Sequence, residues 1–343
     1  MEDRIMNKWM KELGPSSDVV VSSRVRLARN FNDLSFTHHA SDEELKQVTI
    51  KVKELLQEND EFQLKLIDID DLSELERKML VEKHLISPEH TQVNKYKSVA
   101  LSEDETVSLM LNEEDHLRLQ MILPGLQIEK TWEMADQLDD YIENKIDVAF
   151  AEGYGYLTAC PTNVGTGLRV SVMVHLPALS MINRVEKLMS AISQLGLAVR
   201  GLYGEGTDTV GNLYQISNQV TLGHSEEEII ENLLGVTQQI IEQEKNARKL
   251  LLREQEVSVK NKAYRAHGIL THAYSISIEE AMELISNVRL GIDLGMIRKI
   301  EPIILNQVMV MIRPATLQST KGEKLSIEER EIYRAALIKD LLD

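Results

Sequence analysis

The sequence predicts an α+β fold, with strands and helices alternating at first and helices alone forming the end of the chain. Short runs such as residues 168–176 alternate apolar and polar side chains, and this period of two is typical of strands. Runs with a helical period, such as residues 131–146, lie between them. After Gly223, three Ser-x-Glu-Glu sequences each predict the start of a helix.

These patterns divide the chain into a short lead (residues 1–16), a mixed α/β domain (17–250) and a helical C-terminal domain (251–343). The expected elements of the mixed domain, in order, are strand 18–29, helix 41–58, strand 62–69, helix 72–84, three short strands between 98 and 125, helix 131–146, strand 168–176, helix 178–195, a strand from 197 into a glycine-rich loop, and strand 213–217. Helices then begin at Ser225, Ser277 and Ser326, the first running to about residue 254.

Composition limits the kinds of protein that the chain can be. It has 343 residues, 43% of them hydrophobic, which is enough for a sizeable core. No apolar run approaches the roughly 20 residues of a membrane span, and residues 1–14 lack a signal-peptide core. The net charge of −17 repels nucleic acid and anionic lipid but attracts basic partners. We therefore expect a cytoplasmic protein with neither a nucleic-acid nor a membrane partner, and the single cysteine fits a reducing compartment.

Arg24 and Arg26 stand two residues apart in the first expected strand, so their side chains point to the same face. Two adjacent cations repel each other unless a polyanion such as a triphosphate lies between them. The alternative is an exposed basic strand edge. His84, at the end of a predicted helix, either stacks on a base or simply finishes that helix.

An acidic turn, Asn112-Glu-Glu-Asp115, lies between two of the short strands, with Arg118 just beyond it. Only one of Glu113 and Glu114 can point into a given site if the segment is extended. Such a turn is either part of a site or merely solvated.

The only cysteine, Cys160, lies on a turn rich in Pro, Thr, Asn and Gly that runs into the strand beginning near Arg169. Such a turn exposes backbone N–H groups to an anion. Cys160 is therefore either a thiol beside a phosphate site or a small buried hydrophobic residue. A second glycine-rich stretch, residues 200–211, carries Arg200 and Glu205 and is either a lid over the site or an inert hairpin.

The motifs SSRVRLARN, NEEDHLR, CPTNVGT with Arg169, and RGLYGEG occur in the order and spacing of the ATP:guanidino phosphotransferases, the family of creatine and arginine kinases. The resemblance covers roughly residues 17–250. Within that family the chain looks like the bacterial protein arginine kinases, because it begins almost directly at the catalytic domain and continues into a helical extension. The resemblance implies an antiparallel sheet flanked by helices and Mg-ATP as substrate, with no tightly bound metal.

The resemblance also implies roles for individual residues. Glu114 and Glu205 would hold the acceptor guanidinium, Cys160 would be the active-site thiol and His84 would approach the nucleotide. The loop residues Leu202 and Tyr203 differ from the small and basic residues associated with arginine kinases, which argues against a small substrate. The implied ATP-binding set is Ser22, Ser23, Arg24, Val25, Arg26, His84, Arg118, Arg169, Val170, Ser171, Val172, Met173, Arg200, Gly201, Leu202, Tyr203, Gly204 and Glu205.

The helix after Ser326 contains Arg330-Glu331-Ile-Tyr-Arg334-Ala335, which is similar to the RDxxRA motif with which bacterial protein arginine kinases bind phosphoarginine. Arg330 and Arg334 are four residues apart and share a helix face, a spacing that suits a phosphate. Here Glu331 replaces the motif's Asp. The alternative is a solvated helix with Glu–Arg pairs.

The resemblance implies transfer of the γ-phosphoryl group of ATP to arginine side chains of proteins, which would mark damaged or regulatory proteins for Clp-type degradation in the stress response. Implied partners are arginine-bearing substrates, an activator similar to McsA, a Clp ATPase or protease, and further copies of the chain. The alternatives are a small-molecule guanidino kinase and an inactive phosphoarginine-binding adaptor.

Overall fold

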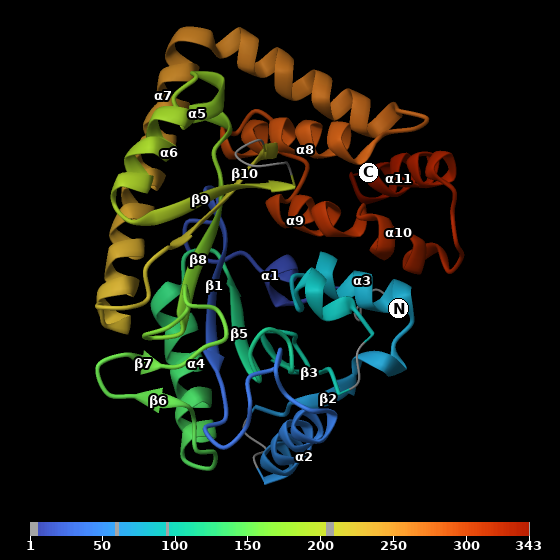
Figure 1. Ribbon diagram of the computed structural model, residues 1–343. Coiled ribbons are helices and arrows are strands. Elements are labelled where there is room, and N and C mark those ends of the chain that lie inside the picture. The colour runs from blue at the N-terminus through green and yellow to red at the C-terminus, as the bar shows by residue number, and fades with distance from the viewer. Residues whose placement is uncertain (1–5, 59–61, 94–95, 204–208, 343) are drawn as a thin grey trace.

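The computed structural model describes residues 6–58, 62–93, 96–203 and 209–342. An antiparallel sheet with strand order β2-β3-β4-β5-β1-β8-β10-β9 forms its centre (Figure 1). The predicted α+β fold, an antiparallel sheet flanked by helices with a helical C-terminal region, is therefore confirmed. The strands are β1 (Val20–Arg29), β2 (Lys65–Asp68), β3 (Ser98–Leu101), β4 (Val107–Leu111), β5 (Leu117–Pro124), β8 (Leu168–His175), β9 (Leu197–Tyr203) and β10 (Thr209–Asn218), with a separate hairpin of β6 (Phe150–Ala151) and β7 (Gly155–Tyr156).

The helices flank this sheet and then form a group of their own. They are α1 (Lys8–Lys11), α2 (Asp42–Glu58), α3 (Glu74–Glu82), α4 (Ile128–Glu143), α5 (Pro177–Met181), α6 (Val185–Gln194), α7 (Glu226–His272), α8 (Ile278–Asp293), α9 (Pro302–Met311), α10 (Pro314–Lys321) and α11 (Ile327–Leu342), with short 3₁₀ turns at Ile69–Asp71 and Pro88–Thr91.

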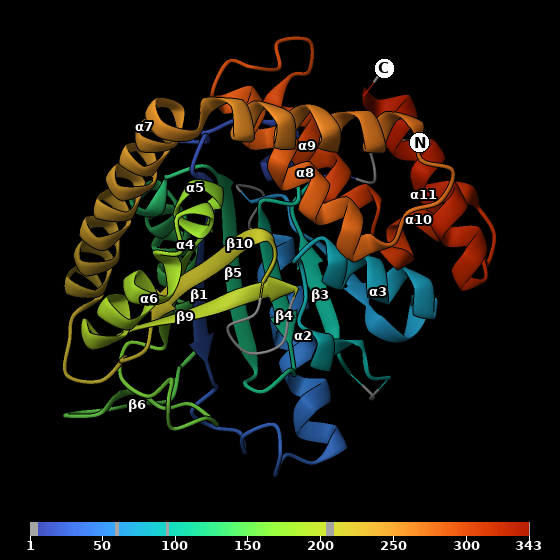
Figure 2. The same ribbon diagram turned by 90° about the horizontal axis from the view of Figure 1, so that it is seen from above.

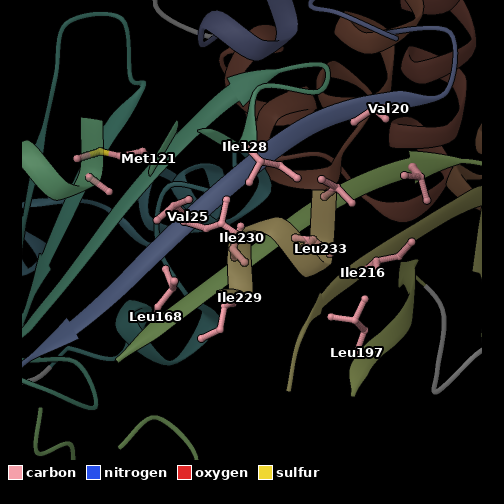
Figure 3. Packing of buried hydrophobic residues seen from close by; sticks show 14 of the residues in the cluster. Val20, Val25, Met121, Ile128, Leu168, Leu197, Ile216, Ile229, Ile230 and Leu233 are labelled. Carbon is pink, nitrogen blue, oxygen red and sulfur yellow. The ribbon is translucent and has the colours of Figure 1, made fainter. Parts of the chain in front are cut away.

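One face of the sheet is apolar because its strands alternate with period two. Val25, Leu168 and Ile216 point to this face and are almost completely buried. They pack against Ile128 of α4 and Ile230 of α7 in the main core, as Figure 3 shows. The polar residues between them, including Arg24, Arg26 and Arg169, consequently point to the opposite face.

The C-terminal helices cover one end of that opposite face. Ile122, Met173 and Leu213 of the sheet belong to a second apolar cluster with α8, α9 and α11. The helices α8 to α11 lie together at the end of the sheet where β1 begins (Figures 1 and 2). The rest of the polar face lies outside this cluster and carries the candidate site.

Several predicted elements have different bounds in the structure. The expected helix 178–195 is two helices, α5 and α6, because Asn183 between them has a φ of 54°, which a helix does not accommodate. The helix from Ser225 extends beyond the expected end to His272, with a break in helical geometry at Gln255. The predicted boundary between residues 250 and 251 thus lies inside α7, shortly before this break.

The capping residues chosen from the sequence do begin helices. The Ser225 and Ser326 hydroxyls accept from the backbone N–H groups of residues 228 and 329, whose carboxylates in turn accept from the N–H groups of the capping residues. Ser41 and Glu44 exchange the same bonds at α2. Among the described residues no helix combines the length and apolar character needed to cross a bilayer.

Candidate functional site

Arginines from four strands line one cleft on the polar face of the sheet. Arg26 of β1 lies directly opposite Arg169 of β8, and cross-strand partners of this kind project to the same side. Arg118 of β5 lies opposite Ala28, next along β1 on that face, and Arg200 comes from β9. The cleft has a volume of about 240 Å³. Its lining is Arg26, Leu27, Ala28, Glu114, Asp115, Arg118, Cys160, Thr162, Asn163, Gly167, Arg169, Arg200, Gln215 and Ser217.

Arg24 lies one step further along β1 on the same face, as the sequence predicts. Its Nη2 donates to Gln215 Oε1 at 2.7 Å and its Nε to Ser171 Oγ at 3.5 Å. These contacts hold the Arg24 guanidinium over β8 and β10, beside Arg26. The pair therefore belongs to one surface and not to an exposed strand edge.

The arginines of this cleft crowd one another. Burial and then the charges of Arg24, Arg118 and Arg169 lower the pKa of Arg26 well below its usual range. Burial, Arg200 and Arg118 likewise lower the pKa of Arg169. Arg26 Nε is buried and has no hydrogen-bond partner within the described ranges. Arginines that crowd one another in this way, with a buried donor still unused on Arg26, suit a polyanionic ligand.

The two adjacent glutamates of the acidic turn have different partners. Both oxygens of Glu113 accept from Arg118 Nη1, at 2.9 and 2.8 Å, and Glu113 Oε1 also accepts from the Ser87 hydroxyl at 2.6 Å. Burial alone would raise the pKa of Glu113, but Arg118 and Ser87 outweigh it and lower that pKa to about 2. Glu113 is thus a fixed anion that holds Arg118 in place.

Glu114 instead lies at the rim of the cleft beside Cys160. Partial burial, followed by the charges of Asp115 and Glu113, raises the pKa of Glu114, while Arg118 and a hydrogen bond from the Cys160 thiol oppose this rise. A carboxylate with a raised pKa is a better proton acceptor than an ordinary one.

The loop that carries Cys160 is tied to the acidic turn and to β1. Asp115 Oδ1 accepts from the Ala159 N–H at 2.7 Å and from Asn30 Nδ2 at 2.6 Å. Gly167 has a φ of 64°, and a Cβ there would come within 2.7 Å of the Ala28 carbonyl oxygen, so only glycine fits this close approach. Cys160 itself is half-buried, with Sγ 3.0 Å from the Thr162 hydroxyl, and is not a packed core residue.

His84 lies beside the arginines at the other end of the site. It follows α3 with a φ of 61°, and its carbonyl oxygen accepts from Gln120 Nε2 at 2.7 Å. Burial, followed by the charges of Arg24, Arg313 and Arg26, lowers the pKa of the imidazole to about 3. His84 is therefore neutral at physiological pH and too weak a base to remove a proton from a guanidinium.

Some residues of the predicted nucleotide set cannot line the cleft. The side chains of Val25, Val170 and Val172 lie on the apolar face in the main core. Ser23 also lies on that face, where its hydroxyl donates to the Gly125 carbonyl at 2.8 Å. Those assignments came from contiguous motifs, but a strand places only every second side chain on one face.

The remaining members of the predicted set fall into three groups. Ser22 and Met173 are buried near the C-terminal helices, and Ser171 binds Arg24. Gly201 belongs to β9, as does the backbone of Leu202 and Tyr203. Gly204 and the second predicted carboxylate, Glu205, lie outside the described residues.

Two polar residues of β10 were missed in the sequence. Gln215 and Ser217 line the cleft, and Gln215 binds Arg24. The alternation of β10 could have identified them: Tyr214 and Ile216 occupy the apolar positions, so Gln215 and Ser217 lie on the polar face. Within the described ranges no group of three or more His, Cys, Asp or Glu side chains is placed to hold a metal ion.

The segment similar to the phosphoarginine motif has one accessible arginine, not two. Arg334 is 4% exposed, and it donates to the carbonyl oxygens of Ile312 at 3.1 Å and Ile276 at 2.8 Å. Ala335 is buried in the second apolar cluster, whereas Glu331 is half-buried. Arg330 lies at the surface, in a groove between α3 and the C-terminal helices. The prediction that both arginines face one ligand is therefore wrong for Arg334, since its guanidinium is used inside the fold.

Comparison with known proteins identifies the family to which this arginine-lined cleft belongs. Residues 47–247 match the model of the ATP:guanido phosphotransferase C-terminal catalytic domain. This chain belongs to that family. Residues 256–343 match the model of the protein-arginine kinase McsB C-terminal domain. The two matched regions lie on either side of the break at Gln255 in α7.

Similar proteins cover almost the whole chain. A protein-arginine kinase from Halothermothrix orenii is 54% identical, over 98% of this chain and 97% of its own length. One from Bacillus subtilis is 47% identical, over 98% of this chain and 93% of its own. Among solved structures, lombricine kinase has a TM-score of 0.60 at 24% identity, covering 69% of this chain and 70% of that one. Taurocyamine kinase from Schistosoma mansoni has a TM-score of 0.62 at 24% identity, covering 70% of this chain and 36% of its own. At this identity the solved structures show a shared fold.

Proposed function

We propose that this chain transfers the γ-phosphoryl group of Mg-ATP to the guanidinium group of arginine side chains in proteins. The observation that carries this proposal is the single cleft in which arginines of four strands face Glu114 and Cys160. Similarity over nearly the full length to proteins named protein-arginine kinase supports the same conclusion.

The cationic part of the cleft suits the polyphosphate. Phosphoryl transfer spreads negative charge over the oxygens of the transferred group, so catalysis depends mainly on positioning and electrostatic stabilisation. Arg26 and Arg169 project from central strands, and Glu113 fixes Arg118 before any ligand arrives. Donors held in this way need little reorganisation during the reaction. Mg²⁺, bound to the nucleotide, neutralises part of the phosphate charge.

The acceptor half of the cleft suits a guanidinium group. Free guanidinium has a pKa above 12 and is a poor nucleophile until it loses a proton. Glu114 can pair with it, orient its nitrogen and accept that proton, and Cys160 can contact the same group. The new N–P bond forms as the bond from the γ-phosphorus to the bridging oxygen breaks, and ADP leaves. Glu205 is proposed as the second carboxylate from the resemblance of its motif.

Other parts of the proposal rest on the likeness to protein-arginine kinases. They are a role in marking damaged or regulatory proteins for Clp-type degradation under stress, an activator protein, self-association, and a cytoplasmic location. The net charge of −17 favours arginine-bearing substrates over acidic ones.

The deciding experiment incubates the chain with Mg-ATP and a denatured, arginine-containing protein and maps acid-labile phosphate by mass spectrometry. We expect phosphoarginine on the protein. Glu114→Gln should lower its formation by about 10²-fold or more while Mg-ATP still binds, because the nucleotide contacts lie elsewhere in the cleft. Near-normal turnover by this variant would contradict the role of Glu114.

Two alternatives give different results in the same assay. A small-molecule guanidino kinase would phosphorylate free arginine and leave the protein unmodified. An inactive adaptor would bind phosphoarginine-bearing protein without turning over ATP.

A further inference from the structure

The C-terminal helices are fastened to the mixed α/β domain right beside His84. The carboxylate of Glu82, at the end of α3, accepts from the N–H groups of Ala315 and Thr316 at 2.8 and 2.7 Å and from the Thr316 hydroxyl at 2.7 Å. These N–H groups belong to the first turn of α10, where helices leave donors unpaired and favour a negative charge. Figures 1 and 2 both show α10 beside α3.

The residue that precedes α10 is Arg313, which is fixed from both directions. On one side, Glu82 holds the N–H groups that follow it. On the other, the buried Arg334 of α11 donates to the carbonyl oxygen of Ile312 at 3.1 Å. Glu82 lies two residues before His84, so the backbone of Arg313 is held close to the His84 end of the site.

The charge of Arg313 acts on His84, as do the charges of the β1 arginines Arg24 and Arg26. Burial is the main cause of the lowered pKa of His84, and the charges of Arg24, Arg313 and Arg26 lower it further. A third arginine brought to this point from a different part of the chain adds to the mutual repulsion there. A bound anion would relieve this repulsion.

The order of the site residues along β1 indicates which part of a bound nucleotide would lie nearest Arg313. Glu114 and Cys160 line the cleft with Ala28, whereas Arg24 lies two steps back along the same strand. If the γ-phosphoryl group is directed towards Glu114, the remainder of the nucleotide points towards Arg24 and His84.

We propose that Arg313 is a further nucleotide-binding residue, which the C-terminal helices contribute to the end of the site near the α-phosphate and ribose. The inference rests on the proposed function, since it takes ATP as the ligand. It gives the helical region a direct part in nucleotide binding. The hydrogen bonds from α10 to Glu82 and from Arg334 to the Ile312 carbonyl oxygen position Arg313.

The test measures Mg-ATP binding by calorimetry and, separately, the kinetic constants of the full chain. Arg313→Ala should weaken Mg-ATP binding about tenfold and raise its KM to match, with kcat and the KM for the acceptor protein little changed. Arg313→Lys should recover part of the loss, because it restores a cation but not the fork of the guanidinium. Arg298→Ala, an exposed arginine of the same helical region, is the matched control and should bind normally.

A double-mutant cycle separates positioning from general damage. If Glu82 acts through Arg313, adding Glu82→Ala to Arg313→Ala should weaken binding little further, whereas Glu82→Ala alone should weaken it several-fold, by about 1 kcal/mol or less in free energy of binding. Unchanged Mg-ATP binding by Arg313→Ala would overturn the proposal, as would a general loss in which kcat and the melting temperature fall and the acceptor KM rises together. Because binding needs no acceptor, these results stand apart from a failure to phosphorylate protein.

Discussion

Two groups of arginines in this molecule have opposite surroundings. In the cleft, Arg26 and Arg169 face other arginines, and burial together with the charges of these neighbours lowers their pKa values. At the junction with the C-terminal helices, Arg248 binds Glu244 and the Asp18 carbonyl oxygen at 2.9 and 2.7 Å.

Arg289 and Arg334 belong to the second group. Arg289 donates to Asp293 and to two backbone carbonyl oxygens, those of Ser17 and Pro302, and Arg334 likewise donates to two carbonyls. The residue type is the same in both groups, but the partners differ. Arginines with satisfied donors hold the fold together, while arginines that face one another are arranged for a ligand.

The largest expected effect comes from Arg26→Ala, which removes a cleft arginine. Phosphoryl transfer should fall by about 10²- to 10³-fold, because one preorganised donor to the transition state is lost. The melting temperature should stay constant or rise, because a source of like-charge repulsion has gone. Activity and thermal unfolding are measured on the same preparation, with the exposed Arg265 changed to Ala as the control. A large fall in melting temperature would place Arg26 with the structural arginines instead.

The converse experiment is Arg334→Ala, which removes a packed arginine. It leaves two buried carbonyl oxygens without their donor, and the free energy of unfolding should fall by about 3 kcal/mol. At saturating Mg-ATP, activity per folded molecule should fall much less than in Arg26→Ala, because Arg334 touches no reacting group and acts on nucleotide binding only through the backbone of Arg313. Urea unfolding measures the loss, and Arg330→Ala, at a half-buried arginine one turn earlier on α11, should cost less than about 0.5 kcal/mol. Equal stability of the two variants would contradict the distinction drawn here.

A smaller effect is expected when Glu113, the carboxylate that holds Arg118 in the cleft, is changed. Its pKa is about 2 in the folded chain and about 4.3 when unfolded. A lowered pKa stabilises the fold above the unfolded value, and this contribution is lost as the pH falls from about 4.3 towards 2. At pH 7 Glu113→Gln should therefore unfold more easily than wild type by about 2 kcal/mol. The two proteins should converge near pH 2 to 3 in urea titrations; a difference that does not depend on pH would show that Glu113 acts without its charge.

Local patterns were sufficient to predict much of this structure. Period-two alternation located the strands of the main sheet but not the β6–β7 hairpin, and the Ser-x-Glu-Glu sequences located the starts of α7, α8 and α11, because both signals depend only on neighbouring residues. The same alternation places Arg24 and Arg26 on one face. The family motifs then pointed to the residues of four segments that meet in the cleft.

The partners of each side chain depended on the tertiary structure. The local sequence Asn112-Glu-Glu-Asp115 does not show which partner each glutamate has. In the structure Glu113 pairs with Arg118 and Ser87, while Glu114 lies at the rim of the cleft beside Cys160. Likewise, the spacing of Arg330 and Arg334 fixes a common side of α11 but not which part of that side is buried.

The role of Arg313 shows the same limit most clearly. Its surroundings come from α3, α10 and α11, which are far apart in the sequence and meet only after packing. The sequence by itself determined the strands of the main sheet, most of the longer helices and which sides of the strands are polar. Only the tertiary structure decided which charges meet, because electrostatic and hydrogen-bond energies depend on distances between atoms that local sequence does not set.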